Sequence, residues 1–175
     1  LREGEQRLIL QGWNHRGETY DYNDTIHHRV EKQAERTPYR IAISMGAEAL
    51  TYKDLNERAN HLAHYLRAQG VVADQLVGIS LERSLDMVIA ILAVLKAGGA
   101  YVPVDPANPE ERIRFILDDA GVALLLTQSS VAGQIPAGRH KALLLDQMQS
   151  ELAVQPSHNP EPLAHGDSRA YVIYT

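Results

Sequence analysis

Apolar residues recur along this chain with the spacing of helices in some stretches and of buried strands in others. Between Thr51 and Gly70 they follow the helical spacing and would share one face, at Leu55, Ala59, Leu62, Ala63 and Leu66. Thr51 and Asp54 have the spacing of a capping box, and Gly70 is placed to end the helix. The pattern predicts an amphipathic helix here.

The segment from Leu85 to Ala97 is apolar on nearly all sides, so it should be the most buried helix, with Ile91 in the core. Ser84 is placed to cap it, and Asp86 is favourable in its first turn. Lys96 lies in the last turn, where a cation complements the helix dipole.

Two further helices are predicted nearer the ends of the chain. One runs from about Thr25 to Arg36, with Asp24 as its cap. The other begins after Asn108-Pro109 and ends at Gly121.

Short apolar runs alternate with these helices and predict strands. They lie at residues 41–45, 76–80, 100–102, 122–127, 142–145 and 171–175. Strands that alternate with helices predict an α/β fold with a mainly parallel sheet flanked by helices. Residues 155–166 contain three prolines and are predicted as a loop.

Composition excludes several classes of function. The net charge of −5 argues against non-specific binding to nucleic acid or to an anionic membrane. No run of about eighteen apolar residues is present, so no membrane span is predicted. The chain has no cysteine, which removes disulfides, thiolate nucleophiles and Cys-based metal sites and fits the cytoplasm.

The stretch from Leu95 to Pro106 combines a helix end, a tight turn, a short strand and a proline-limited exit. It resembles Leu-Lys-Ala-Gly-x-Ala-Tyr-Val-Pro-(Ile/Leu)-Asp, a signature of the adenylation domains of non-ribosomal peptide synthetases. These domains belong to the acyl-adenylate-forming ligases. Val104 is the one departure, a mild apolar exchange.

Two more motifs occur in the family's order. Residues 50–55 resemble its first signature, Leu-(Thr/Ser)-Tyr-x-(Glu/Asp)-Leu, and residues 170–175 resemble the strand that leads into its phosphate-binding loop. Arg169 departs from the usual Leu before that strand. Trp13-Asn14 resembles the linker between a condensation and an adenylation domain, although Arg16 departs from its pattern.

The resemblance implies a division of the chain. Residues 1–24 would be an interdomain linker without regular structure, packed on a neighbouring domain through Trp13, Tyr20 and Tyr22. Residues 25–175 would be the N-terminal part of the large subdomain of an adenylation domain, truncated before the Ser/Thr/Gly-rich phosphate loop. Thr175 matches the residue that opens this loop, which implies contact with ATP; the alternative is a strand-terminal Thr without a ligand. No catalytic residue and no metal ligand is assigned.

The implied activity is ATP-dependent activation of an amino acid, with Mg²⁺, to an aminoacyl adenylate. The product would load onto the phosphopantetheine of a carrier protein, in an assembly line that also holds condensation domains and makes an antibiotic or siderophore. These 175 residues alone are expected to be inactive. The alternatives are an acyl- or aryl-acid CoA ligase of the same superfamily, and a non-catalytic linker or interaction module.

Other chemical candidates have simpler interpretations. No GxGxxG or Walker lysine motif is present. Gly98-Gly99 could cradle a phosphate, but a helix cap is favoured. His61 and His64 have a chelating spacing, but a solvated polar face is favoured. The acidic pairs Glu110-Glu111 and Asp118-Asp119 are interpreted as a helix start and a solvated helix end.

Overall fold

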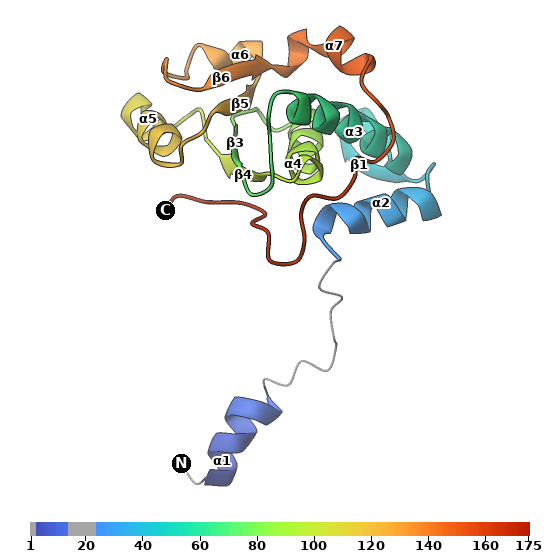
Figure 1. The fold of residues 1–175 in the computed structure, drawn as a ribbon, viewed down its shortest axis with the longest axis vertical. Helices are drawn as coiled ribbons and strands as arrows, with labels where there is room; N and C mark the ends of the chain where they lie inside the picture. Colours follow the sequence, from blue (N-terminus) through green and yellow to red (C-terminus); the bar gives the residue numbers. More distant parts are fainter. Residues whose placement is uncertain (1–2, 14–23) are drawn as a thin grey trace.

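The computed structural model describes residues 3–13 and 24–175 (Figure 1). Its centre is a four-stranded parallel sheet of order β4-β3-β5-β6. The strands are β3 (Leu76–Ile79), β4 (Ala100–Pro103), β5 (Leu124–Thr127) and β6 (Lys141–Leu144). The predicted α/β class with a mainly parallel sheet is confirmed.

Helices cover both faces of this sheet, because the strand residues alternate between two apolar clusters. Leu124 and Leu126 belong to the cluster under α3 (Tyr52–Ala68) and α4 (Leu85–Ala97). Leu125 belongs to the cluster under α5 (Glu110–Asp119). This period of two is the geometry of a strand buried on both sides.

Smaller elements complete the body of the molecule. The strands β1 (Ile41–Met45) and β2 (Glu48–Thr51) form an antiparallel pair, turned at Gly46 with a φ of 60°. The remaining helices after residue 24 are α2 (Ile26–Arg36), α6 (Ser129–Ala132), the 3₁₀ turn η2 (Leu145–Gln147) and α7 (Gln149–Ala153). No helix in the described ranges is long and apolar enough to cross a membrane.

The predicted helix signals are largely confirmed. The Thr51–Asp54 capping box forms, with the Asp54 amide 3.1 Å from Thr51 Oγ1. Ser84 Oγ accepts a hydrogen bond from the Met87 amide. The expectation for Asp24 was wrong: Thr25 occupies the N-cap position of α2, and Asp24 instead pairs with Arg29 and Lys32 at 2.9 and 3.1 Å.

The expectation that α4 is the most buried helix holds for most of its length, from Ile89 to Ala97. Ile91 is the exception, since it is only partly buried and lines a cavity. Lys96 lies in the last turn of α4, as predicted. Its residue is 3% exposed and its ammonium group is paired with Glu31 of α2, a partner that the sequence did not indicate.

The N-terminal expectation was wrong where the structure describes it. Residues Glu3–Arg7 form α1 and residues Leu8–Gly12 form a π-helical turn, η1. Glu, Gln, Arg and Leu are good helix formers, and this composition outweighs the turn-forming Gly4 and Gly12. Trp13 is 73% exposed. Tyr20 and Tyr22 lie outside the described residues.

Residues 154–170, called the strap below, contain no regular element, which confirms the predicted loop. The strap runs past α3 and α2 and leads to the C-terminal segment beside β4 (Figure 1). The strand predicted at 171–175 was wrong, because only Tyr171 pairs, in a single parallel bridge with Tyr101. The reason is Pro103: it has no N–H to donate two residues further along β4, so the ladder stops.

Candidate functional site: the carboxyl edge of the sheet

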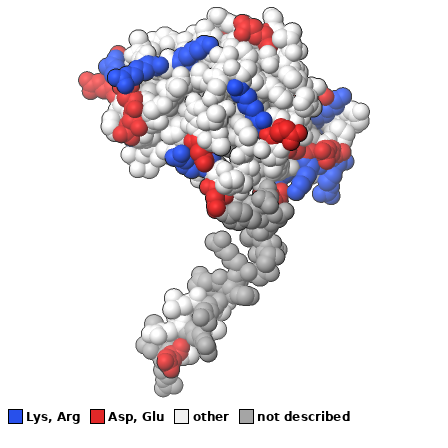
Figure 2. All heavy atoms as spheres, in the orientation of Figure 1, with Lys and Arg blue, Asp and Glu red and all other residues white. Residues whose placement is uncertain are grey.

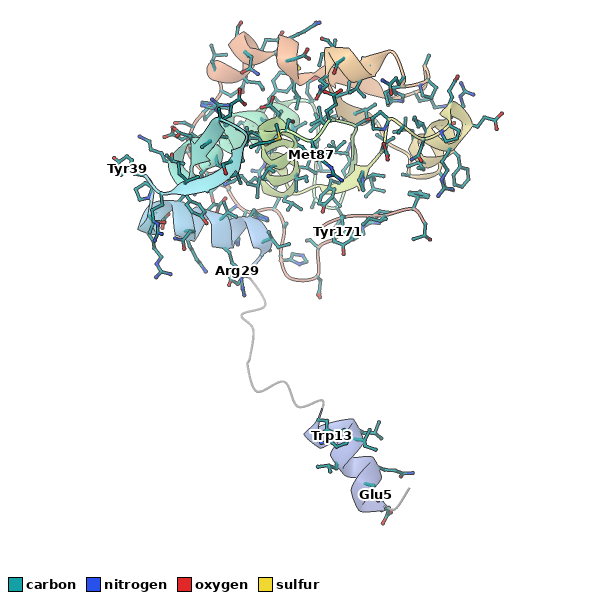
Figure 3. All side chains as sticks on the ribbon, turned by 180° about the vertical axis from the view of Figure 1, so that it is seen from behind. Glu5, Trp13, Arg29, Tyr39, Met87 and Tyr171 are labelled. Carbon is teal, nitrogen blue, oxygen red and sulfur yellow. The ribbon has the colours of Figure 1, made fainter. Side chains whose placement is uncertain are left out.

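A crevice of about 370 Å³ opens at the carboxyl ends of β3 and β4. Ligands of open α/β sheets gather at this edge. Most of its lining is apolar and comes from the two strands, the loops that follow them and the first turns of α4, where Met87 lies (Figure 3). The polar residues of its lining are Glu82, Arg83 and Asp105.

Two fully buried hydroxyl residues lie at the same edge. Ser80 directly follows β3 and Thr127 ends β5, and the Ser80 amide donates to the Leu126 carbonyl at 2.8 Å. Neither hydroxyl has a hydrogen-bond partner among the residues that the structure describes. Buried polar groups are normally bonded, so these two hydroxyls are exceptions among the described residues. Sequence reasoning missed them, because each follows an apolar run and looks like an ordinary strand residue.

The loops around the crevice are tied together by polar side chains. Gln128 makes two hydrogen bonds with Glu82, accepting from its amide at 3.3 Å and donating to its carboxylate at 3.1 Å. Asp146 accepts from the Ser129 amide, and bonding to Ser129 is the main cause that lowers the Asp146 pKa. Of these residues, Glu82 lines the crevice, and it is bonded to the loop after β5. The lining contains acidic as well as basic groups.

The crevice has fewer positive charges than a complete phosphate-binding site would need. Arg83 is the one cation in its lining among the described residues. On the face seen in Figure 2, acidic and basic side chains are interspersed and do not form a basic cluster. Within the described residues, no three His, Asp or Glu side chains are placed to hold a metal ion.

Thr175 lies against α5 and is not part of the crevice lining. Its carbonyl accepts a hydrogen bond from Arg112 at 3.1 Å. The preceding Tyr174 donates its hydroxyl to Asp119 at 2.7 Å, which raises the Tyr174 pKa, and its ring meets Phe115 edge to face. The segment runs parallel to β4, so it points towards the carboxyl edge of the sheet. Asp118 and Asp119 are both exposed, as predicted for a solvated helix end.

The histidine pair has a different environment from the one expected. The His61 Nδ1 atom lies 2.7 Å from the Gln155 carbonyl, and the His64 Nε2 atom lies 3.0 Å from the His158 carbonyl. Both carbonyls belong to the strap. The interpretation as a purely solvated face was therefore wrong, and the two side chains bind main chain.

The favoured interpretation of Gly98-Gly99 as a helix end is confirmed. Gly98 has a φ of 95°, and its amide and that of Gly99 donate to carbonyls of the last turn of α4. Amides already engaged in this way cannot cradle a phosphate.

Comparison with known proteins gives the family. Residues 30–175 match the model of the AMP-binding enzyme family, so this chain belongs to the AMP-binding enzymes. Its resemblance to adenylation domains of non-ribosomal peptide synthetases is confirmed by the relatives it matches.

Those relatives are large synthetases, of which this chain matches a small part. It is 43% identical to bacitracin synthase 3 of Bacillus licheniformis over 175 residues, all of this chain and 3% of that protein. It is 45% identical to gramicidin S synthase 2 of Brevibacillus brevis, again over its whole length and 4% of that protein. It therefore spans a few per cent of the length of these relatives.

Solved structures of non-ribosomal peptide synthetases also resemble this chain. A crystal structure of the nonribosomal peptide synthetase FmoA3 aligns with a TM-score of 0.83 and 31% identity, covering 90% of this chain and 17% of that chain. An artificially fused adenylation–PCP di-domain, NpsA-ThdA from Klebsiella oxytoca, aligns with a TM-score of 0.80 and 26% identity, covering 89% and 29%.

Proposed function

We propose that the protein to which this chain belongs activates an amino acid with ATP. An oxygen of the amino acid carboxylate attacks the α-phosphorus, the bond from that phosphorus to pyrophosphate breaks, and aminoacyl-AMP and pyrophosphate result. The observation that carries the proposal is the family match over residues 30–175, to which the identity with the bacitracin and gramicidin S synthases adds support. A further form of the FmoA3 structure is bound to AMPPNP, which supports ATP as the co-substrate.

Within this reaction, residues 25–175 would serve as the N-terminal scaffold of the adenylation domain. Thr175 ends a segment that runs parallel to β4 towards the carboxyl edge, where nucleotides bind in open sheets. We propose that its hydroxyl helps to hold the ATP phosphates. The developing phosphate charge needs several cations, and a Mg²⁺ ion bound to the nucleotide would supply part of that charge.

The partners proposed are a carrier protein and a condensation domain. The aminoacyl group would pass to the phosphopantetheine thiol of the carrier, which the adenylation–PCP fusion among the structural neighbours supports. Residues 1–24 are proposed as the linker to a preceding condensation domain. A reaction that consumes ATP and feeds such an assembly line is expected in the cytoplasm.

The experiment is amino-acid-dependent exchange of labelled pyrophosphate into ATP, run on the whole protein across a panel of amino acids. Exchange with one amino acid or a few related ones is the expected result. If acyl or aryl acids support exchange and CoA thioesters form instead, the protein is a CoA ligase. If no acid supports exchange, the interaction module is the better description.

A titration of the 175-residue chain with Mg-ATP tests whether these residues only support the nucleotide site or already bind the nucleotide themselves. We expect no micromolar dissociation constant, because one arginine in the crevice cannot balance a nucleotide's charge. Micromolar binding would show that the described residues already contain a nucleotide site.

A further inference from the structure

The strap is held on the body by one polar face of α3. Four side chains of this face bond to its main-chain carbonyls: Asn60, His61, His64 and Arg67. The carbonyls belong to residues 157, 155, 158 and 161, at distances of 2.7, 2.7, 3.0 and 2.7 Å. Because the acceptors are main-chain atoms, these bonds fix the path of the backbone itself.

The side chain of Asn159, in the strap, also bonds to this polar face. Its Oδ1 atom accepts hydrogen bonds from Asn56 Nδ2 at 2.9 Å, Asn60 Nδ2 at 3.0 Å and Lys96 Nζ at 3.2 Å. The Lys96 side chain is fully buried and is also paired with Glu31. A single amide oxygen thus joins the strap to α3 and α4, and through Lys96 to α2.

The C-terminal end of α4 packs against residues 161–163 of the strap. Arg67 donates to the carbonyls of Lys96 and Ala97 at 2.7 and 3.3 Å while it binds Glu161 of the strap. A Cβ atom added at Gly98 would lie 2.8 Å from Cβ of Leu163. The Lys-Ala-Gly signature therefore contacts the strap at each of its three residues, directly or through Arg67, which helix capping alone does not explain.

The far end of the strap is fixed at the start of the sheet. The Arg169 amide donates to Asp74 Oδ1 at 2.7 Å, and its guanidinium donates to the Asp74 carbonyl at 3.2 Å. The Tyr101 amide then donates to the Ala170 carbonyl at 3.1 Å, and the Val172 amide donates to the Tyr101 carbonyl at 3.0 Å. These two sheet bonds set the register of residues 171–175.

From this chain of contacts we propose that Asn159 and Lys96 are positioning residues for the C-terminal segment. They hold the strap in the path that delivers residues 171–175 to β4 in one register, and so place Thr175 relative to the carboxyl edge. Neither residue is proposed to touch substrate. The expected effect of these residues on nucleotide binding rests on the proposed function. Their expected effect on how residues 171–175 pair with β4 does not.

The test compares three variants at matched positions of the strap. Asn159→Leu has a similar volume but no acceptor, Asn159→Asp keeps an acceptor oxygen, and Ser157→Ala alters an exposed side chain while leaving its bonded carbonyl intact. Hydrogen exchange at the amides of Tyr101 and Val172 reports the register. Amino-acid-dependent pyrophosphate exchange by the whole protein reports KM for ATP and for the amino acid.

Asn159→Leu should speed exchange at Tyr101 and Val172 and leave the β5 amides protected. It should raise KM for ATP about 10- to 100-fold, the range expected for a binding group misplaced by about 1 Å, with KM for the amino acid unchanged. Asn159→Asp and Ser157→Ala should match the wild type. Arg67→Met loses the bond to Glu161 but keeps an apolar stem. It should also speed amide exchange at Tyr101 and Val172 and raise KM for ATP, each by less than Asn159→Leu does. This variant provides the test if Asn159→Leu does not fold.

The proposal is overturned if Asn159→Leu behaves as Ser157→Ala does, or if KM for both substrates and protection across the whole sheet change together. Absence of pyrophosphate exchange in the wild type would defeat the proposed function alone. The hydrogen exchange at Tyr101 and Val172 would still decide whether the strap sets the register.

Discussion

Glu31 and Lys96 form an ion pair that joins α2 to α4 across 65 positions of sequence, with the Lys96 side chain fully buried. Burial lowers the pKa of Lys96, and the hydrogen bond and charge of Glu31 oppose that shift. A buried cation of this kind depends on its partner, because its desolvation is costly when it is left alone.

Removal of Glu31 should therefore be strongly destabilising. Glu31→Leu is expected to lower the free energy of unfolding by about 3–5 kcal/mol, since it leaves Lys96 buried and uncompensated. The double variant with Lys96→Met should recover much of this loss. Urea unfolding measures both, with Glu35→Gln on the exposed face of α2 as control. A loss equal to that of the control would contradict the pairing.

His27 should make the protein sensitive to acid. It is 5% exposed, and burial is the main cause that lowers its pKa to about 4, with His28, Lys96 and Arg67 adding repulsion. The folded pKa lies below the unfolded value of 6.5, so the stabilisation is complete above pH 6.5 and is lost as the pH falls towards 4.

The size of this effect follows from the difference between 6.5 and about 4. It corresponds to at most about 3 kcal/mol of unfolding free energy between pH 7 and pH 4. His27→Leu should flatten the pH dependence of urea unfolding over that range. His165→Ala, at an exposed position, should leave the dependence unchanged; an equal slope in both variants would refute a role for His27.

The capping box of α3 should contribute about 1 kcal/mol, measured as the loss caused by Thr51→Ala. Hydrogen bonds from Thr51 are the main cause that lowers the Asp54 pKa below 3.8. The stabilisation that depends on the carboxylate is thus present above pH 3.8 and is lost as the pH falls through the folded value. The cost of Thr51→Ala, measured by urea unfolding, should shrink below that pH. A cost that does not change with pH would mean that Asp54 contributes nothing through its charge.

Substitutions that introduce a charge should destabilise the protein more on the buried face of α4 than on the face that lines the crevice. Val94 is completely buried, so Val94→Asp should cost several kcal/mol through an unpaired buried charge. Ile91 is partly exposed at the crevice, so Ile91→Asp should cost clearly less. Melting temperatures of the two variants give the comparison, and the reverse order would mean that the face assignment is wrong.

The helices and core were predictable because their signals are local. The apolar face of α3, the cap at Ser84 and the left-handed Gly98 each depend on residues a few positions apart, and each is found as expected. Ile91 was placed in the core because a helix that is apolar on all sides has no face that its sequence marks as outward.

The polar contacts were not predictable, because their partners are distant in sequence. His61 and His64 looked solvated since nothing nearby reveals main-chain acceptors 94 residues away. Lys96 was interpreted through the helix dipole for the same reason. In the candidate site, Thr175 was found only through a family resemblance, and the crevice is assembled from loops that periodicity does not connect.

The strap also has a consequence for the kinetics of folding. Its bonds to α3 close loops of 94 to 103 residues, as between His61 and Gln155 or Asn56 and Asn159. Contacts that close long loops form late, after the sheet and its helices have assembled. Loss of Asn159 should therefore leave the refolding rate nearly unchanged and accelerate unfolding, so the strap contributes to how long the native state persists more than to how fast it is reached.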